Sequence, residues 1–409
     1  MLFAAVRRQR VLQYHPVLRL HFSSGFIDVD KFQESLRLNK TLSKLKDAHS
    51  NGAIQIVKDI YPENSNEVNS DRSLPMCKFL KDEIFAKTEN ELIQQWRKPL
   101  VKWFRLGVYC MKYYRDGIKN TYLTYKETRE LLNKYERQSK TPLITRMYQN
   151  IEYNEIKNRN IKGQNKIEPL PISRKDYVES FRRRQIWKLP VLIITLVLFE
   201  ELTAVLFYFF PKIAPHNCLT PGGFFKVTQS LRKLSPIGDT LKYQSPYGLS
   251  KKPLFFILRN STTIQLPKWK LKLYEKLDNR KIPCETLARI HQYIFVDDWL
   301  LLQYFLHKPV AKISYKELVN CIWERQLYYL EEDLNYMVNN DEGRRVLLWR
   351  LFIYWSFRFD GTITVGSGQL FSEKWGINNV SILNFSGMKD NMLVTRNDLN
   401  NLDGVDVCK

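Results

Sequence analysis

The apolar sequence LPVLIITLVLFEELTAVLFYFF, residues 189–210, constrains the fold more than any other part of the chain. A helix of this length reaches about 33 Å, which matches a bilayer core of roughly 30 Å. Glu200 and Glu201 stand at its centre, and two acids at about +2.5 to +3 kcal/mol each nearly offset the roughly −6 kcal/mol of the apolar residues. We therefore predict one membrane span whose glutamates face protein, from partner helices or a second copy of the chain.

A core helix of a soluble fold is the alternative, and it would have to bury the same two carboxylates. Basic residues flank the segment on both sides, with the slightly stronger excess C-terminal to it. By the positive-inside rule this excess favours a C-terminal domain in the matrix.

The N-terminal sequence MLFAAVRRQRVLQYHPVLRLHFSSGFID interleaves arginines with apolar residues and holds no acid before Asp28. Such a segment forms a helix with one cationic and one apolar face, and the membrane potential draws it toward the matrix. We predict that residues 1–24 are a mitochondrial presequence and that the protein resides in the inner membrane. A basic N-terminal helix of the mature fold is the alternative.

The formal net charge of the chain is +22, which favours polyanionic partners such as RNA, anionic lipid surfaces or acidic proteins. Genome base composition is an alternative source of part of this excess. Six scattered cysteines lack metal-ligand spacing, and the chain holds no P-loop, dinucleotide fingerprint or G-x-S-x-G elbow. We therefore expect no enzyme, no metal and no cofactor.

Helical periodicity dominates the remaining sequence, so we predict a mainly α protein with helical domains on both sides of the span. Capping boxes at Thr124, Ser173 and Ser314 predict helices that start near residues 125, 174 and 315. We interpret Asp297 and Asp298 as a further helix start. The expected regions are a partly disordered N-terminal region (25–95), a helical pair and linker (96–172), the basic helix start and span (173–215), a proline-rich region (216–282), a helical domain (283–360) and a tail (361–409).

A helix is expected from about residue 91 to 122, with lysines and an arginine along one face. The face is either an ordinary solvated surface or a contact with RNA or lipid head groups. The apolar sequence GRRVLLWRLFIYWSFRF, residues 343–359, is too short to span, so we expect a core helix or a helix against the bilayer surface. His291 and His307 are expected in core positions rather than in catalysis.

Residues 173–215 form a pattern of a basic helix start, a proline-led apolar span with an acid inside it, and a Phe-Pro pair followed by another proline. The residues of this pattern are Ser173, Arg174, Lys175, Pro190, Glu200 or Glu201, Phe210, Pro211 and Pro215. The pattern resembles the LETM family of mitochondrial inner-membrane proteins. The later sequence ISYKELVNCIWERQL resembles a helix of that family's ribosome-binding domain, which the resemblance places at residues 283–360. Because a calcium loop and a C-terminal coiled coil are missing, the resemblance implies a divergent, shortened member.

The charge and this resemblance together predict an inner-membrane adaptor that binds mitochondrial ribosomes and supports translation or membrane insertion of organelle-encoded proteins. The alternatives are cation and proton exchange through Glu200 and Glu201, or assembly of a respiratory complex. Inner-membrane lipid and ribosomal RNA or protein are the expected partners. The candidate ribosome or RNA contacts are Lys98, Lys102, Arg105, Lys112, Lys119, Arg174, Lys175, Lys316 and Arg325.

Overall fold

The computed structural model describes residues 39–60, 68–138, 141–160, 172–199, 210–211, 213–231, 251–260, 266–329, 331–359, 379 and 383. These residues form a mainly α-helical fold, as the sequence predicts. The helices are α2 (Lys40–Ser50), α3 (Lys81–Glu89), α4 (Lys98–Gln138), α5 (Leu143–Asn160), α6 (Arg174–Arg182), α7 (Leu189–Phe199), α9 (Pro221–Leu231), α10 (Lys251–Asn260), α11 (Lys268–Lys276), α12 (Lys281–His307), α13 (Tyr315–Glu324), α14 (Leu334–Asn339) and α15 (Asp341–Phe359). Short 3₁₀ helices are η1 (Asp71–Ser73), η2 (Arg183–Lys188) and η4 (His216–Cys218), and the strands are β1 (Ile54–Val57) and β2 (Ala311–Ser314).

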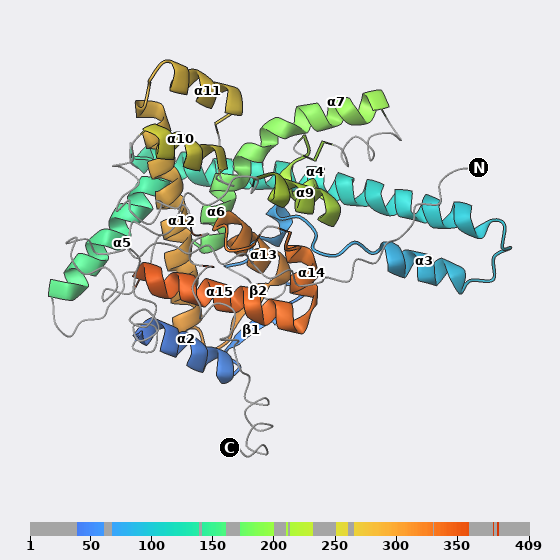
Figure 1. Cartoon of the computed structure of the whole chain (residues 1–409), viewed down its shortest axis with the longest axis horizontal. Helices are drawn as coiled ribbons and strands as arrows, with labels where there is room; N and C mark the ends of the chain where they lie inside the picture. Colours follow the sequence, from blue (N-terminus) through green and yellow to red (C-terminus); the bar gives the residue numbers. More distant parts are fainter. Residues whose placement is uncertain are drawn as a thin grey trace, which may run out of the picture.

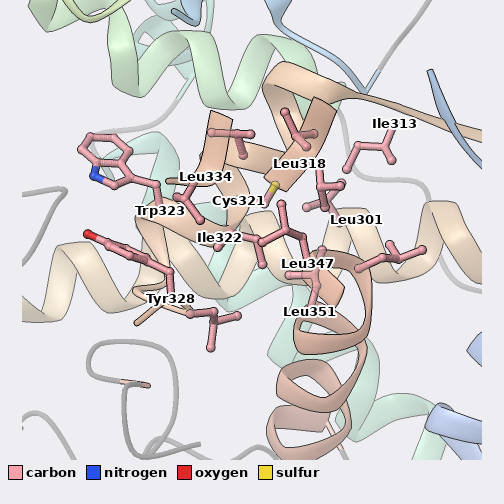
Figure 2. Close-up of a cluster of buried hydrophobic side chains, with 14 of the residues drawn as sticks. Leu301, Ile313, Leu318, Cys321, Ile322, Trp323, Tyr328, Leu334, Leu347 and Leu351 are labelled. Atoms are coloured by element: carbon pink, nitrogen blue, oxygen red, sulfur yellow. The ribbon is translucent and has the colours of Figure 1, made fainter. Parts of the chain in front are cut away.

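Helix α12 passes through the interior of the molecule (Figure 1). It contributes side chains to both clusters of the hydrophobic core. Its N-terminal part packs with α4, α5, α6 and α10 in one cluster. Its C-terminal end packs with α2, α13, α14 and α15 in the other, where Leu301 meets Leu318, Cys321 and Leu347 (Figure 2). Nearly every side chain of α12 from Ile290 to Leu302 is buried, as expected of a helix segment that other elements surround.

A two-stranded parallel sheet joins the N-terminal region to the C-terminal helices. Strand β1 pairs with β2 in a register that places Ile54 opposite Ala311. Just before it, Leu42 and Leu45 of α2 are buried against the α15 side of the core. The region predicted to be partly disordered therefore contributes ordered elements, because its few apolar residues find long-range partners that local sequence does not reveal.

Two of the three capping boxes mark true helix starts. Ser173 accepts a hydrogen bond from the backbone N–H of Asp176 at 3.2 Å, and Ser314 accepts one from the N–H of Glu317 at 3.1 Å. The start predicted near residue 125 is wrong, because Thr124 is buried in the middle of the 41-residue helix α4. No proline or glycine follows Tyr122 to end that helix, so its periodicity continues.

Residues 143–160, in the part of the 96–172 region where the linker is expected after the helical pair, form α5. Its inner face carries Leu143, Met147 and Ile151 at spacings of four, and α5 packs against α12 through them. Three apolar residues suffice for a packed helix here, because α12 supplies the opposite wall.

The two ends of the apolar segment lie beside each other. Lys188 donates from Nζ to the backbone carbonyl oxygen of Ala214 at 3.2 Å. A crossing helix would separate these ends by about 30 Å. Elements before and after the segment also share one core, α6 with α12 and α2 with α15. The predicted arrangement, with helical domains on opposite sides of a single span, is therefore wrong.

Within the described ranges, we find no helix whose length and hydropathy suffice to cross a bilayer. Glu200 and Glu201 lie outside the described residues.

Helix α4 and η4 approach each other closely at Gly117. A Cβ atom at this position would lie 2.5 Å from Sγ of the buried Cys218. The neighbouring Asn217 donates from Nδ2 to the carbonyl oxygen of Gly117 at 2.9 Å. Glycine is thus required by the contact that fixes the end of the apolar segment against α4. Gly107, two to three turns earlier on the same helix, has no atom within 4 Å of such a Cβ.

We expect Gly117→Ala to lower the free energy of unfolding by about 1–3 kcal/mol, since the added methyl overpacks the contact. The matched change Gly107→Ala should instead raise it by up to about 1 kcal/mol through helix propensity. Chemical denaturation of the purified protein measures both. Adding Cys218→Ala to Gly117→Ala should recover part of the loss. Equal effects of the two glycine changes would contradict the close contact.

Candidate functional site

Helix α7 presents an apolar surface to solvent. Leu189 and Leu192 pack into the core, whereas the side chains of Val197 and Leu198 are 70% and 69% exposed. In Figure 1 α7 lies along the upper edge of the molecule, directed away from the core. Trp187, just before α7, is 80% exposed. The exposed apolar residues of α7 are Val191, Ile193, Ile194, Val197 and Leu198.

This surface rules out the alternative of a core helix for the start of the segment. A core helix buries its apolar residues, whereas among the α7 side chains whose burial the structure describes only Leu189, at the helix start, and Leu192 are buried. Contiguous exposed apolar residues on this scale are typical of a contact with a membrane or another protein. We take the exposed face of α7 as the candidate functional surface.

A buried ion network lies at the base of this surface. Arg174 of α6 donates from Nε to Oδ1 of Asp297 at 2.7 Å. Arg325 donates to Oδ2 of Asp297 at 2.6 Å and to Oδ1 of Asp298 at 2.6 Å. All four side chains are at most 2% exposed. Burial alone raises the pKa of Asp297, but the two arginines outweigh it and lower the pKa to about 2.

Glu317 extends the network toward the N-terminal region. Its carboxylate lies 3.2 Å from the guanidinium of Arg174 and 3.6 Å from that of Arg182. It also accepts a hydrogen bond from the backbone N–H of Ser70 at 2.7 Å. Arg182 in turn lies 3.6 Å from Glu324, whose pKa is raised by burial.

Helix α15 closes the network around Asp298. The carboxylate accepts hydrogen bonds from the hydroxyl of Tyr354 at 2.6 Å and from Nε1 of Trp355 at 2.9 Å. Arg358 lies 3.1 Å from it as well. Every oxygen of this buried carboxylate therefore has a donor, as a buried charge requires.

The network fixes the helix that leads into α7. Both Arg174 and Arg182 belong to α6, and between them Glu179 accepts from the Ser70 hydroxyl at 2.8 Å and from Nε of Arg72 at 3.0 Å. Helix α6 runs through η2 directly into α7. The exposed apolar helix therefore leaves the molecule from a rigid base.

The sequence interpretation of Asp297 and Asp298 as a helix start is wrong, since both lie in the middle of α12. A signal was available: two acids interrupt the apolar sequence FVDDWLLL, and buried acids require cationic partners. Their partners lie on other elements, so sequence could not identify them. The network residues that sequence reasoning missed in this role are Arg182, Glu179, Glu317, Glu324 and Arg358.

Arg174 and Arg325, two of the residues expected to contact a ribosome, are instead buried in the network. Arg105 is engaged as well, because its guanidinium donates to both oxygens of Glu91 at 2.7 and 2.8 Å. Lys98 and Lys102 pair with Glu89 in the same way.

The remaining candidate contacts stay at the surface. Lys112 and Lys119 are exposed on α4, and Lys175 and Lys316 are half-buried. The exposed face of α4 changes character along its length: it is apolar from Leu100 to Met111 and mainly basic from Lys112 to Lys126. Positions three and four apart share this one face. Its apolar residues are Leu100, Phe104, Val108 and Met111, and its basic residues are Lys112, Arg115, Lys119 and Lys126.

The prolines predicted to bound the span flank the places where the chain leaves and rejoins the core. Pro190 is the second residue of α7, where its missing N–H costs no helical hydrogen bond. Pro211 and Pro215 are buried at the other end, and Pro215 precedes η4 as its N-cap. Phe210, directly before Pro211, is exposed.

The described residues bring together no group of histidines, cysteines and acids able to hold a metal ion. His291 is buried on α12, in agreement with its predicted core position, whereas His307 is exposed at the helix end. Residues 343–359 form most of α15, a core helix that is buried from Leu347 to Arg358.

We expect Arg325→Met to lower the free energy of unfolding by roughly 3–5 kcal/mol, because it leaves Asp297 and Asp298 short of a buried partner. Arg115→Met removes an arginine whose side chain is 74% exposed and should change stability by less than about 0.5 kcal/mol. Denaturant titration of both variants provides the measurement. Equal stability of the two would show that the network contributes nothing that the surrounding packing does not supply.

Comparison with known proteins identifies a family. A family model described as the pentamidine resistance factor domain matches residues 68–306. The chain is also 37% identical to the pentamidine resistance factor, mitochondrial, of Saccharomyces cerevisiae, in an alignment that covers 90% of this chain and 96% of the yeast protein. No solved structure matches. The matched family overturns the resemblance to the LETM family, whose pattern of a basic helix start, an apolar segment and bounding prolines is too short to distinguish the two.

Proposed function

We propose, from the premise that this chain belongs to the family of pentamidine resistance factors, that the protein is an adaptor attached to the mitochondrial inner membrane. The relationship to the yeast protein makes it mitochondrial. In our proposal α7 inserts into one leaflet, and the basic half of the α4 face holds a mitochondrial ribosome. Apolar segments of organelle-encoded proteins then emerge beside the membrane that receives them.

The exposed apolar face of α7 carries the membrane part of the proposal. Five large aliphatic side chains in contact with water are costly, and a lipid phase removes that cost. Because Lys188 and Ala214 lie together, the segment between them starts and ends on the same side of the bilayer. The proposal is therefore insertion from one side, in place of the single span.

The α4 face supports the ribosome part. Lys112, Lys119 and their neighbours form a stripe of exposed cations that can neutralise phosphates of ribosomal RNA. The apolar half of the same face lies directly N-terminal to this stripe, with Met111 and Phe104 more than 70% exposed. A surface that is basic at one end and apolar at the other suits a ribosome and the hydrophobic chain that it produces.

Cation and proton exchange has no comparable support. Its candidate residues, Glu200 and Glu201, lie outside the described residues, and no described group points to transport. We therefore propose the adaptor alone.

Replacing Val197 and Leu198 by glutamine should weaken binding of the purified protein to phosphatidylcholine vesicles by at least about tenfold. Each change removes the gain of burying one aliphatic side chain in lipid. Vesicle flotation provides the measurement. The matched change Tyr336→Gln, at an exposed position of α14, should leave flotation unaltered. Unchanged flotation of the α7 variant would exclude this helix as the membrane contact.

Replacing Lys112 and Lys119 by glutamine should reduce co-sedimentation with mitochondrial ribosomes at low salt. The slope of log affinity against log salt should become shallower by about one for each lysine that contacts a phosphate. Lys40→Gln with Lys44→Gln, on α2, removes the same charge from another surface and should have little effect. A wild-type protein that does not sediment with ribosomes at low salt would refute the ribosome part of the proposal.

A further inference from the structure

A cleft opens beside the base of α7, between the end of α6, η2 and the first turns of α12. Its cavity volume is about 90 Å³, and it is open to solvent on one side. Its lining combines two arginines with apolar side chains and one hydroxyl. These residues are Phe181, Arg184, Leu266, Thr286, Arg289 and Ile290.

Two arginines line this cleft and have no acidic partner in the part of the chain that the structure describes. Arg184 and Arg289 are both exposed to solvent there, and no ion pair or hydrogen bond joins either one to another described residue. Partial burial of the Arg184 side chain lowers its pKa, and the positive charges of Arg289 and Arg183 lower this pKa further. The repulsion between like charges held together at a cleft is reduced when an anion binds between them. Guanidinium groups suit phosphate oxygens in particular, since they donate in a planar fork.

The remaining walls are apolar and fixed. The ring of Phe181 stacks on that of Tyr293 at 3.7 Å between centroids and 12° between planes, and Ile290 is buried. A free inorganic anion gains nothing from such walls. A phosphate attached to an apolar body gains from both the arginines and the walls.

The surroundings of the cleft have the features of a membrane interface. Trp187 is exposed next to it, and tryptophan is enriched at the head-group level of bilayers. Helix α11 begins just after Leu266 and exposes Trp269 and Leu273, and its C-cap residue Leu277 continues this stripe, while Leu271 is buried. Lysines flank this stripe on both sides, as in helices that lie in the plane of a bilayer surface. In Figure 1 α7 and α11 both lie along the upper edge of the molecule.

We propose that the cleft between Arg184 and Arg289 binds the phosphate of an anionic membrane lipid when α7 inserts. This inference rests on the proposed membrane attachment and names the lipid class that the attachment selects. The arginine pair holds the head group, the apolar walls contact the glycerol and upper acyl chain, and α11 lies on the surface beside it.

Vesicle flotation with two lipid compositions tests the site. Wild-type protein should bind phosphatidylcholine vesicles that contain phosphatidylglycerol about tenfold more tightly than vesicles of phosphatidylcholine alone. Arg184→Gln with Arg289→Gln should abolish this preference and leave binding to phosphatidylcholine intact. Lys40→Gln with Lys44→Gln removes the same charge from α2, at the lower edge of Figure 1, and should keep the preference.

Each other outcome overturns the proposal. If the arginine variant keeps the preference for phosphatidylglycerol, the cleft is not the lipid site. If the arginine and lysine variants lose the preference equally, the preference depends on net charge alone. Thermal unfolding with inorganic phosphate separates the two sources of the anion. Stabilisation of the wild type, but not of the arginine variant, by phosphate at low millimolar concentration would assign the cleft to free phosphate instead of lipid.

The same phosphate titration separates this inference from the proposed function. If wild-type protein binds neither kind of vesicle, the membrane attachment fails and the lipid assignment fails with it. Phosphate stabilisation that depends on the two arginines would then leave an anion site of a different kind.

Discussion

The contact of Arg174 and Arg325 with the carboxylate of Asp297 holds the two halves of this chain together. Arg174 comes before the apolar segment, and the other two residues come after it. Each of these charges is buried and has lost its hydration. The attraction between the paired charges must therefore offset the lost hydration free energy. Glu317 connects the same network to Ser70 in the N-terminal region, and Asp298 connects it to α15. A fold built in this way cannot place its halves on opposite sides of a membrane.

That constraint determines what the apolar segment can do. Its ends are fixed by the Lys188 contact with Ala214 and by the close approach of Gly117 to Cys218. Helix α7 extends from this fixed base with its aliphatic face uncovered, and the basic and apolar halves of α4 run past the same region. Rigid attachment and an exposed apolar helix are what insertion from one side requires. The cleft between Arg184 and Arg289 lies beside the base of α7.

Local features of the fold were predictable from sequence, and long-range ones were not. The caps at Ser173 and Ser314 follow from a hydroxyl and an acid three residues apart, which is a local interaction. The helical class follows from periodicity in the same way. Arg174 is buried against a partner more than a hundred residues away in the chain, and Arg325 against acids on another helix. The sequence shows only that both residues are charged, so it predicts a surface contact for them. The apolar segment has the length of a span, and long-range contacts, between its ends and between Arg174 and Asp297, show that the described elements before and after it pack together.

The sidedness of residues before and after the apolar segment tests this account most directly. Arg129 on α4 and Glu285 on α12 are both exposed, and each can be replaced by cysteine in a chain whose accessible native cysteines are changed to serine. A membrane-impermeant thiol reagent is then applied to inner-membrane vesicles of known orientation. The account predicts that both cysteines react from the same side of the membrane, and that detergent adds no further labelling from the other. Reaction of one cysteine from each side would contradict it.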